Sequence, residues 1–521
     1  MRRIYSLFLT LVCVCMVQAR EHVMISDPEH WNVNELLAYV GKEVVFDVPM
    51  VVCNNYSMLT VSPHRTYSPT NQALPGTDDY RSVVSLNGSR EVSLSGVSGY
   101  HRTGERIENL VATVHKSGAQ PVLSYVSGSF VGNTRADLMK GPDMSVIDPE
   151  NERNLLVCTM NLEYYLAYQF DPSSSMGPAN AAEHVKQREK TIKALSTINA
   201  DLYGFVEIQC GDSALREITN YMNKALPHRD YKYIPSGTAA SGTYTQSCFM
   251  YDAKKVEPKG ARIDIEAEVV NRKKMQIFRE KESEETFIFS LNHFKAKSGS
   301  GTGLNADQGD GQGLFNQRRV NEAIAVLDRY SILSIQAKDS DMLVMGDLNA
   351  YAMEDPIMTF VRRGAMTDLH RYFHADSSYS YTFRGQAGYL DHALCTPTML
   401  PQITGMAAFH INSDEDDRYT YDGSWNDGSM FRCSDHDPVV VGLRLNKTLR
   451  PSSEIQVNAM SVLEDRSDIV IKNAKYTNTP AYYAIYTVSG LLMDKGEIDS
   501  NAQIVPRPTM AGMYILGVYA N

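Results

Sequence analysis

The stretch Met345-Gly346-Asp347-Leu348-Asn349-Ala350 follows a short apolar run, Met342-Leu343-Val344. An apolar run that ends at a glycine turn predicts a buried strand, although the pattern alone also fits a segment of buried helix. Side chains two residues apart leave an extended strand on the same face, so Asp347 and Asn349 are expected side by side. The carboxylate can orient or deprotonate a water, and the amide can hydrogen-bond a phosphate oxygen. The same pair also fits an Asx turn that merely closes the strand.

Similar polar clusters adjoin the other short apolar runs of the chain. They are Asn161 after Met160, Glu207 within residues 204–209, Asn292-His293 after Leu291, Leu390-Asp391-His392, and Ser434-Asp435-His436-Asp437-Pro438 before Val439. In α/β sheets, polar residues at several strand ends converge on one crevice. Carboxylates, amides and two histidines suit a phosphate and a hard cation such as Mg²⁺, Mn²⁺ or Ca²⁺. Zinc is disfavoured, because the sequence has no His-x₃-His or paired cysteine spacing.

The pattern of apolar residues divides the chain into three regions. Residues 22–142 contain short β-rich runs separated by Gly, Pro, Ser and Asn, which predicts an all-β unit. A small OB-like barrel would fit, either as a binder of single strands or sugars or as a scaffold. Residues 150–446 alternate strands with helices at 181–199 and 316–335, which predicts an α/β domain. Residues 460–521 read as a small β unit, with strands at 469–471, 482–488 and 513–519.

The N-terminus predicts export from the cytoplasm. Arg2-Arg3 precedes an apolar run at residues 4–17, and Val17-Gln18-Ala19 has the small-x-small pattern of a cleavage site, so residues 1–19 are predicted to be a signal peptide. A lipoprotein signal is the rival, since Cys13 and Cys15 lie within it, but neither follows the usual small residue. No other segment approaches the roughly 18 apolar residues of a membrane span. The protein is therefore predicted to be secreted or on the cell surface.

Charge and cysteine content restrict the function further. After removal of residues 1–19, the chain carries 48 basic and 61 acidic residues, a balance of −13. A protein that binds DNA mainly by charge would be basic, so any nucleic acid must be bound locally, with help from a cation. The six remaining cysteines are too sparse for a disulfide scaffold, and the sequence does not choose among their fifteen full pairings.

Several of these motifs, in this order, resemble the endonuclease/exonuclease/phosphatase superfamily, to which deoxyribonuclease I belongs, and in particular its large secreted bacterial nucleases. The resemblance covers roughly residues 150–445. Its motifs are Asn292-His293-Phe294-Lys295-Ala296-Lys297-Ser298, residues 307–313, Asn316 with Arg319, residues 346–351 with Glu354-Asp355-Pro356, residues 381–386, Leu390-Asp391-His392, and His410-Ile411-Asn412 with Asp414-Glu415. It implies a four-layer α/β/β/α sandwich, preceded by an OB-like all-β barrel.

The last 60 residues resemble, more weakly, the sorting domain of type IX secretion, which implies a small β-sandwich and contact with the secretion machinery. The matching residues are Tyr483-Ala484-Ile485-Tyr486 with Gly490, and Gly512-Met513-Tyr514-Ile515. The chain departs from that pattern at its end, where Ala520-Asn521 replaces the usual basic residues.

The resemblance also implies roles for individual residues. Glu207 is expected to be the principal metal ligand, with Asn161 and Asp435 beside it, and the metal to be Mg²⁺ or Mn²⁺, with a structural Ca²⁺ also open. Asp347 and Asn349 are expected to hold the attacking water or the phosphate. His293 and His436 are the expected acid and base, in either order, and Asp391 is expected to pair with His436 and fix its tautomer.

Other polar residues are expected to contact substrate or solvent. Lys295, Lys297, Arg318 and Arg319 are the candidates for contacts with flanking phosphates, against the alternative of a solvated surface. Asn161 and Asn292 are further candidates for contacts with the substrate. The glycine-rich loop at residues 298–313 fits a flexible lid or a second cation site, and the lid is the preferred interpretation. The acidic run at residues 414–417 reads as a solvated loop.

Together these expectations describe a secreted, monomeric, divalent-metal-dependent nuclease. It would hydrolyse DNA phosphodiester bonds by in-line attack of water, with endonuclease action favoured over exonuclease and RNA open as a second substrate. The first rival is another phosphoesterase of the same fold, sphingomyelinase-like or acting on inositol phosphates. The absence of an evident aromatic hairpin argues against a lipid substrate. The second rival, a binding module without catalysis, would be expected to lack one of Glu207, His293, Asp347 or His436, and all four are present.

Overall fold

The computed structural model describes most of the chain. The described residues are 20–25, 27–56, 58–170, 176–236, 244–265, 271–446, 460–464, 468–473, 481–487, 492–498, 502–506 and 514–520. The predicted signal peptide at residues 1–19 lies outside them. Within these ranges, no helix combines the length and the apolar character needed to cross a membrane.

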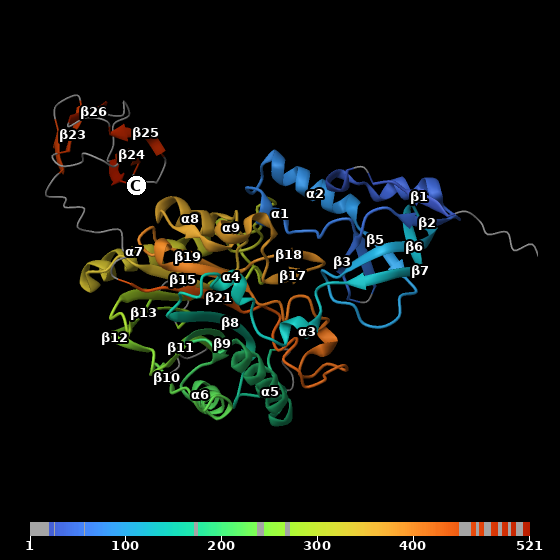
Figure 1. Cartoon of the computed structure of the whole chain (residues 1–521), viewed down its shortest axis with the longest axis horizontal. Coiled ribbons are helices and arrows are strands. Elements are labelled where there is room, and N and C mark those ends of the chain that lie inside the picture. Colours follow the sequence, from blue (N-terminus) through green and yellow to red (C-terminus); the bar gives the residue numbers. More distant parts are fainter. Residues whose placement is uncertain are drawn as a thin grey trace, which may run out of the picture.

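The N-terminal unit is built around a sheet whose strands pair in a closed ring (Figure 1). Its strands are β1 (Glu21–Val23), β2 (Glu43–Phe46), β3 (Met50–Asn54), β4 (Leu59–Ser62), β5 (Val92–Ser95), β6 (Arg106–Ser117) and β7 (Gln120–Val131). The order is β1-β2-β6-β3-β4-β5-β7, and β6 also pairs with β7, so β3, β4, β5, β7 and β6 form a ring. Alternate residues, such as Val44 and Phe46 on β2, point into its core.

This unit also contains helices, and the prediction that it is all-β was wrong in that respect. They are η1 (Pro28–His30), η2 (Val33–Tyr39), α1 (Pro69–Gln72) and α2 (Asp78–Arg90). Helix α2 buries none of its residues, so it has no apolar stripe for a periodicity argument to detect. Local contacts stabilise the N-terminus of this helix. The Thr77 hydroxyl accepts a hydrogen bond from the backbone N–H of Tyr80, and Asp78 and Asp79 occupy the first turn.

Two six-stranded sheets form the centre of the next unit. The first has the order β10-β11-β9-β8-β21-β20, and the second β12-β13-β14-β15-β19-β16. The strands of the first are β8 (Leu155–Tyr165), β9 (Leu202–Gln209), β10 (Tyr231–Tyr233), β11 (Thr245–Asp252), β20 (Ile403–Ala408) and β21 (Val439–Leu443). Those of the second are β12 (Val256–Asp264), β13 (Lys273–Glu280), β14 (Thr286–His293), β15 (Met342–Asp347), β16 (Thr367–Asp368) and β19 (Asp391–Cys395).

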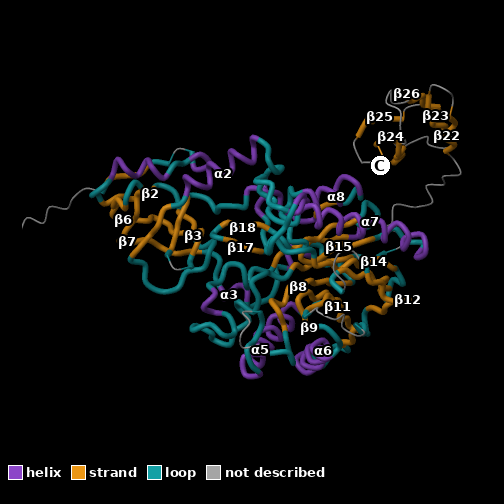
Figure 2. The backbone as a smooth tube through the Cα atoms, turned by 180° about the vertical axis from the view of Figure 1, so that it is seen from behind, coloured by secondary structure: helices purple, strands orange, loops and turns teal. Residues whose placement is uncertain are grey.

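The two sheets pack face to face, and helices cover their outer faces (Figures 1 and 2). On β8, Leu155 and Val157 pack between the sheets, whereas Cys158 and Met160 pack against the outer helices. The helices on that side are α5 (Ala181–Ile198) and α6 (Ser213–Ala225), and those on the other side include α7 (Asn316–Ala337) and α8 (Asp355–Arg363). The central strands β8, β9, β14 and β15 are buried on both faces over most of their length, as expected for a sheet between two layers. The arrangement agrees with the predicted α/β sandwich.

The predicted elements of this unit agree closely with the observed ones. The helix predicted at 316–335 is α7, and the one at 181–199 is α5, which ends at Asn199 in a left-handed conformation (φ 53°). The strand predicted from Met342 is β15. The short elements include α3 (Arg135–Leu138), α4 (Met144–Ile147), α9 (Leu369–His374) and the hairpin of β17 (Tyr381–Phe383) and β18 (Gln386–Gly388). They also include the 3-10 helices η3 (Gly303–Asn305), η4 (Ala375–Ser377), η5 (Leu400–Gln402) and η6 (Asp417–Tyr419).

Six strands are described near the C-terminus. They are β22 (Met460–Glu464), β23 (Asp468–Asn473), β24 (Ala481–Thr487), β25 (Leu492–Ile498), β26 (Ala502–Pro506) and β27 (Tyr514–Ala520). They pair as two three-stranded sheets, β22-β23-β26 and β25-β24-β27. The predicted strands correspond to β23, β24 and β27. The sorting role of this unit stays a prediction.

Candidate active site

The register of the second sheet places three predicted site residues opposite one another on neighbouring strands. In the parallel pair β14–β15, His293 lies opposite Asp347, and in the antiparallel pair β15–β19, Asp347 lies opposite Asp391. The close approach of β14 and β15 requires glycine at 346, because a Cβ there would lie 2.1 Å from the carbonyl oxygen of Asn292. The first sheet contributes Asn161 on β8 and Glu207 on β9.

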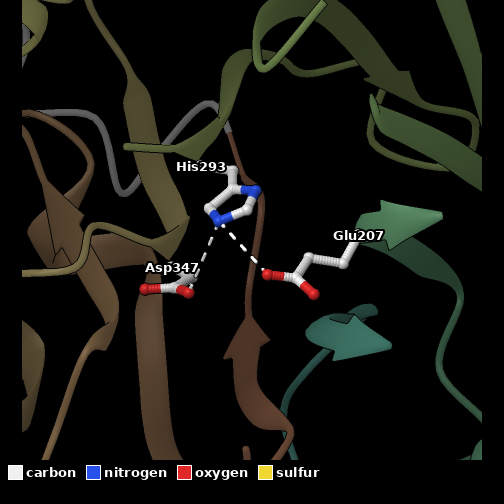
Figure 3. Close-up of side chains that lie close together, drawn as sticks. All are labelled: Glu207, His293 and Asp347. Atoms are coloured by element: carbon white, nitrogen blue, oxygen red, sulfur yellow. Dashed lines mark ion pairs between the residues drawn. The ribbon is translucent and has the colours of Figure 1, made fainter. Parts of the chain in front are cut away.

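Glu207, His293 and Asp347 converge from three strands (Figure 3). The Nε2 atom of His293 lies 3.5 Å from Oε1 of Glu207 and 3.8 Å from Oδ2 of Asp347. One ligand atom from each residue falls within 4.8 Å of the others. Glu207 has a positive φ of 59°, an uncommon backbone conformation for this residue type that aims its carboxylate at the cluster.

Asp347, Asn349 and Asn161 share hydrogen bonds. The backbone N–H of Asn349 donates to Oδ1 of Asp347 (2.9 Å), and Nδ2 of both Asn349 (3.2 Å) and Asn161 (3.1 Å) donates to Oδ2. Asn349 is in the left-handed region (φ 49°) and not in extended backbone. The stretch therefore forms the Asx turn, and its side chains also face the cluster. The two interpretations of its sequence are compatible.

His436 is held by Asp391. Nδ1 of His436 donates to Oδ2 of Asp391 (2.7 Å), and that oxygen also accepts from the Ser380 hydroxyl (2.7 Å). This bond places the proton on Nδ1 and leaves Nε2 directed at the cluster. Nε2 lies 3.9 Å from Oδ2 of Asp347 and 3.9 Å from Oδ2 of Asp435.

Burial and like charges shift the pKa values of the acidic groups upward. Burial raises the pKa of Asp347 to about 7, with Asp391 and Glu207 adding to the effect. Burial and the nearby Asp435 raise the pKa of Glu207. A cluster of carboxylates that repel one another in a dry site is what a divalent cation would neutralise.

The two histidines are shifted in opposite directions. Burial lowers the pKa of His293 well below its usual value, and the nearby Arg272 lowers it further. Burial alone would also lower the pKa of His436, but Asp391, Asp435 and Asp347 raise it well above the usual value. His293 therefore favours the neutral imidazole, which can bind a metal, and His436 favours the protonated form.

The donor set fits a divalent cation. Glu207, His293 and Asp347 supply two carboxylates and one neutral imidazole within 4.8 Å of one another. Carboxylates with a single imidazole suit Mg²⁺ or Mn²⁺. The predicted ligand Asp435 is close enough to affect Glu207, and Asn161 contacts Asp347, so both lie beside this group.

The predicted phosphate-binding residues have structural partners instead of open positions. The Arg319 guanidinium is fully buried and donates to the backbone carbonyls of Lys295 (3.2 Å), Gln312 (2.8 Å) and Leu314 (2.8 Å). Lys297 forms an ion pair with the buried carboxylate of Glu354. Lys295 donates to the carbonyl of Ser298 (2.8 Å). All three side chains are thus engaged in structural contacts, although Lys295 is near enough to His293 to lower its pKa.

Asn292 is a different case, because it is buried next to His293. Its Nδ2 donates to the carbonyl and hydroxyl of Ser290 (3.1 and 3.0 Å). Within the described part of the chain, its Oδ1 has no hydrogen-bond partner.

Sequence reasoning missed Glu163 and Tyr381. The Glu163 carboxyl has its pKa raised to about 8 by burial and by Asp435. Two successive residues, Glu163 (φ 47°) and Tyr164 (φ 52°), are left-handed, a strained turn with no glycine to mark it in the sequence. The Tyr381 ring stacks on the His436 ring, with centroids 4.6 Å apart. Its motif was recognised, but no role was assigned to it.

The acidic run at residues 414–417 is not a solvated loop, and that prediction was wrong. Asp414 is fully buried and accepts hydrogen bonds from Arg65, Thr103 (2.7 Å), Asn133 (2.8 Å) and Tyr379 (2.8 Å). Arg65 and Thr103 belong to the N-terminal unit, and Asn133 follows its last strand, β7. Glu415 is also buried and pairs with Arg102 and Arg135. Apart from Tyr379, the partners lie some 280–350 residues away in sequence, so composition alone could not reveal them.

Two further sequence arguments are revised. The β17–β18 hairpin carries Phe383 at its tip with 52% of its surface exposed, so the argument that no exposed aromatic hairpin exists does not hold. Cysteines 53, 158, 210, 248, 395 and 433 are all buried, and no disulfide joins any two of them.

A model of the endonuclease/exonuclease/phosphatase family matches residues 175–436, half of the chain. No curated protein matches the chain.

Several solved structures are similar to part of the chain. An endonuclease/exonuclease/phosphatase from Bacteroides vulgatus is 15% identical, covers 56% of this chain and 99% of its own, and has a TM-score of 0.38. A mannosyl-6-phosphatase from Bacteroides thetaiotaomicron is 17% identical, with coverage of 56% and 99% and a TM-score of 0.38. The catalytic domain of human Nocturnin, with bound sulfate, is 15% identical, with coverage of 56% and 94% and a TM-score of 0.36.

Proposed function

We propose that this chain, which belongs to the endonuclease/exonuclease/phosphatase family, is a secreted, divalent-metal-dependent nuclease that hydrolyses DNA. The family acts on phosphoester bonds, so the chain is a phosphoesterase. The choice of DNA phosphodiesters, with RNA as a second substrate, is our proposal.

One observation carries the chemistry: the imidazole of His436, bound by Asp391, directs Nε2 to a point 3.9 Å from both Asp347 and Asp435. A group in this position can transfer a proton to or from a water or a phosphate oxygen. Proton transfer by a positioned side chain contributes about 10²- to 10⁴-fold in rate. Asp391 keeps the reactive nitrogen turned inward, and Asp347 and Asn349 are placed to hold the attacking water or a phosphate oxygen.

Glu207, with His293, Asp347, Asp435 and Asn161 around it, would hold the cation. Bound there, a divalent cation supplies Lewis-acid chemistry, neutralising charge on the phosphate as the transition state forms. The buried walls of the site exclude bulk water, which strengthens each of these electrostatic contacts.

Support for a nucleic-acid substrate comes from two sources. The motifs across residues 150–445 resemble secreted bacterial nucleases in particular. The ring of β3, β4, β5, β7 and β6, in which β5 and β7 run parallel, supports an OB-like barrel, a fold that often binds single strands. The predicted signal peptide and the predicted C-terminal sorting unit support export. Neither of them requires more than one copy of the chain, so a monomer is part of the proposal.

A lipid phosphodiesterase is the second candidate, because Phe383 is exposed at a hairpin tip near the site. A substrate panel separates the two. We expect the purified chain, with Mg²⁺, Mn²⁺ or Ca²⁺, to hydrolyse DNA and not sphingomyelin vesicles or a sugar 6-phosphate, and to lose activity with chelator. Hydrolysis of vesicles or sugar phosphate, with DNA left intact, would overturn the substrate assignment and leave the family assignment in place.

A further inference from the structure

A cavity of about 940 Å³ adjoins the candidate active site, and segments far apart in the sequence line it. The N-terminal unit contributes Asn54, Asn55 and Tyr56, the β17–β18 hairpin contributes residues 381–385, and the loop before β21 contributes residues between 413 and 435. In Figures 1 and 2 the hairpin lies beside β3, between the sandwich and the N-terminal unit. The volume of the cavity is at the upper end of the range for sites that bind small ligands.

The cavity is continuous with the candidate active site. Asp435 and Glu163 line it, and both lie beside Glu207. Tyr381 also lines it, and its ring stacks on His436. A molecule in the cavity would therefore be held next to the atoms that would perform the chemistry.

Aromatic rings lead from His436 along the cavity wall. The rings of Tyr381 and Phe383 are nearly parallel, 12° apart, with centroids separated by 6.5 Å. The Arg384 guanidinium lies 5.2 Å from the centre of the Phe383 ring. Tyr56, 59% exposed, stands on the wall that the N-terminal unit supplies.

Most charges on the cavity wall are already paired. Asp416 pairs with Arg418, Asp417 with Arg432, and Glu415 with arginines of the N-terminal unit. Within the described part of the chain, Arg384 has no carboxylate partner, and it is exposed. It is thus a cation that can pair with a phosphate.

The N-terminal wall is attached firmly to the hairpin. The backbone N–H of Ser68 donates to the carbonyl of Ala387 (2.8 Å), and the N–H of Ala387 donates to the carbonyl of Thr66 (2.9 Å). The Thr66 hydroxyl donates to the carbonyl of Gly385 (3.1 Å). These bonds join the N-terminal unit to the hairpin, and Tyr56 and Phe383 line the same cavity.

We propose that this cavity receives unpaired nucleotides of a single strand that flank the scissile phosphate, with bases stacked on Phe383 and Tyr56 and a phosphate on Arg384. The proposal rests on the nuclease function proposed above. Aromatic side chains bind single strands by stacking on the faces of unpaired bases, which a duplex keeps covered. A lipid surface is disfavoured because these rings face a cavity with charged walls and the N-terminal unit opposite.

The test is the affinity of the full chain for a fluorescent six-nucleotide oligothymidylate, measured by anisotropy in a His436→Ala background that slows cleavage. We expect Phe383→Ala and Tyr56→Ala each to weaken binding by about 5- to 100-fold, the loss of one stacked base. Tyr372→Ala is the matched control, because this tyrosine is similarly exposed (60%) but lies on α9, and it should bind as the parent does.

The outcomes separate this proposal from the nuclease function. If the wild type cleaves DNA but both alanine variants bind the oligonucleotide as the parent does, the cavity proposal is overturned and the function stands. If the wild type cleaves no nucleic acid but the variants lose oligonucleotide binding, the binding proposal stands and the nuclease function falls. If the variants lose binding to sphingomyelin vesicles and keep oligonucleotide binding, the cavity is a lipid site and the proposal is wrong.

Discussion

His436 and Asp391 set the chemistry at the scale of single residues. Their hydrogen bond at 2.7 Å holds the imidazole with Nε2 facing two carboxylates, and Tyr381 covers the ring. Ser380 donates to the same oxygen of Asp391, so the aspartate itself is oriented. The pair therefore depends on a supporting hydrogen bond as well as on its own contact.

Replacing Asp391 by Asn should lower kcat by about 10²- to 10⁴-fold, because an amide no longer favours the required tautomer and charge of His436. The unfolding midpoint should change little, since the shapes match. The measurement is kcat on a small phosphodiester with saturating Mg²⁺. Asp376→Asn, an exposed aspartate paired with Arg371, is the control and should keep the wild-type rate. An unchanged kcat for Asp391→Asn would contradict the assigned role.

Arg319→Ala should destabilise the protein by at least about 2 kcal/mol, because it leaves three buried carbonyls without their donor. The measurement is the free energy of unfolding in urea. Arg329→Ala, an exposed change on the same helix, should stay within about 0.5 kcal/mol of wild type. Unchanged stability together with a raised KM for DNA would favour the phosphate-binding role that the sequence suggested.

Residue identities were easier to predict than residue surroundings. The sequence pointed to His293, Asp347, Asp391 and His436, because each adjoins an apolar strand and strand ends share an edge. It could not show that Arg319 is buried, because exposure depends on contacts with the loop at residues 312–314. Nor could it show Glu163, whose position results from a left-handed turn without glycine.

Between elements, the main contact is the buried acidic segment that joins the N-terminal unit to the loop before β21. Asp414 and Glu415 pair there with arginines 65, 102 and 135. Breaking a buried pair is costly because it leaves one charge without compensation. This segment precedes Asp435 and His436, so the N-terminal unit supports the part of the chain that carries them.

Asp414→Ala should lower the free energy of unfolding by about 3–5 kcal/mol, since Arg65 then stays buried alone. Arg65→Met with Asp414→Leu should cost less than the sum of the single changes. Urea unfolding of wild type, Arg65→Met, Asp414→Leu and the double variant measures this coupling. The exposed pair Asp328–Arg363 is the control, and Asp328→Ala should cost less than about 1 kcal/mol. Additive effects at Asp414 and Arg65 would contradict the proposed support.

The same carboxylate predicts a pH dependence. Burial alone would raise the pKa of Asp414, but Arg65 and Arg102 hold it well below its usual range. A carboxyl with a lowered folded pKa adds stability above its unfolded pKa, about 4, and this stability is lost as pH falls toward the folded pKa. Wild type should therefore lose more stability between pH 5 and pH 3 than Asp414→Asn does, measured by thermal unfolding. Equal losses would contradict this assignment.

Elements with a repeating apolar pattern were predicted well, and those without one were not. Helix α7 and strands β9, β14, β15 and β21 follow from periodicity, because one or both of their faces are buried. Helix α2 buries nothing and depends on its cap, so it was missed. The strands of the β17–β18 hairpin have three residues each, which is too short for a repeating apolar pattern to be recognised.

At the scale of the whole molecule, the candidate active site lies between the two six-stranded sheets, and the N-terminal unit forms one wall of the cavity beside it. The two sheets bring Glu207 and Asn161 to His293, Asp347 and Asp391, and the N-terminal unit adds one side of the adjoining cavity. The alternation of strands and helices predicted an α/β domain, and the resemblance to the family implied its four layers. The position of the N-terminal unit was not predictable, because it depends on ion pairs between residues that are far apart in sequence.

The most direct test of the nuclease function is metal-dependent cleavage of a supercoiled plasmid by wild type, His436→Ala and His184→Ala. The control His184 also has a carboxylate partner at 2.7 Å, Glu217, but lies on the outer helices. We predict that wild type and His184→Ala nick the plasmid with Mg²⁺ or Mn²⁺ and not with chelator. His436→Ala should be slower by at least about 10²-fold. Cleavage by His436→Ala at the wild-type rate, or cleavage that persists in chelator, would contradict the proposed mechanism.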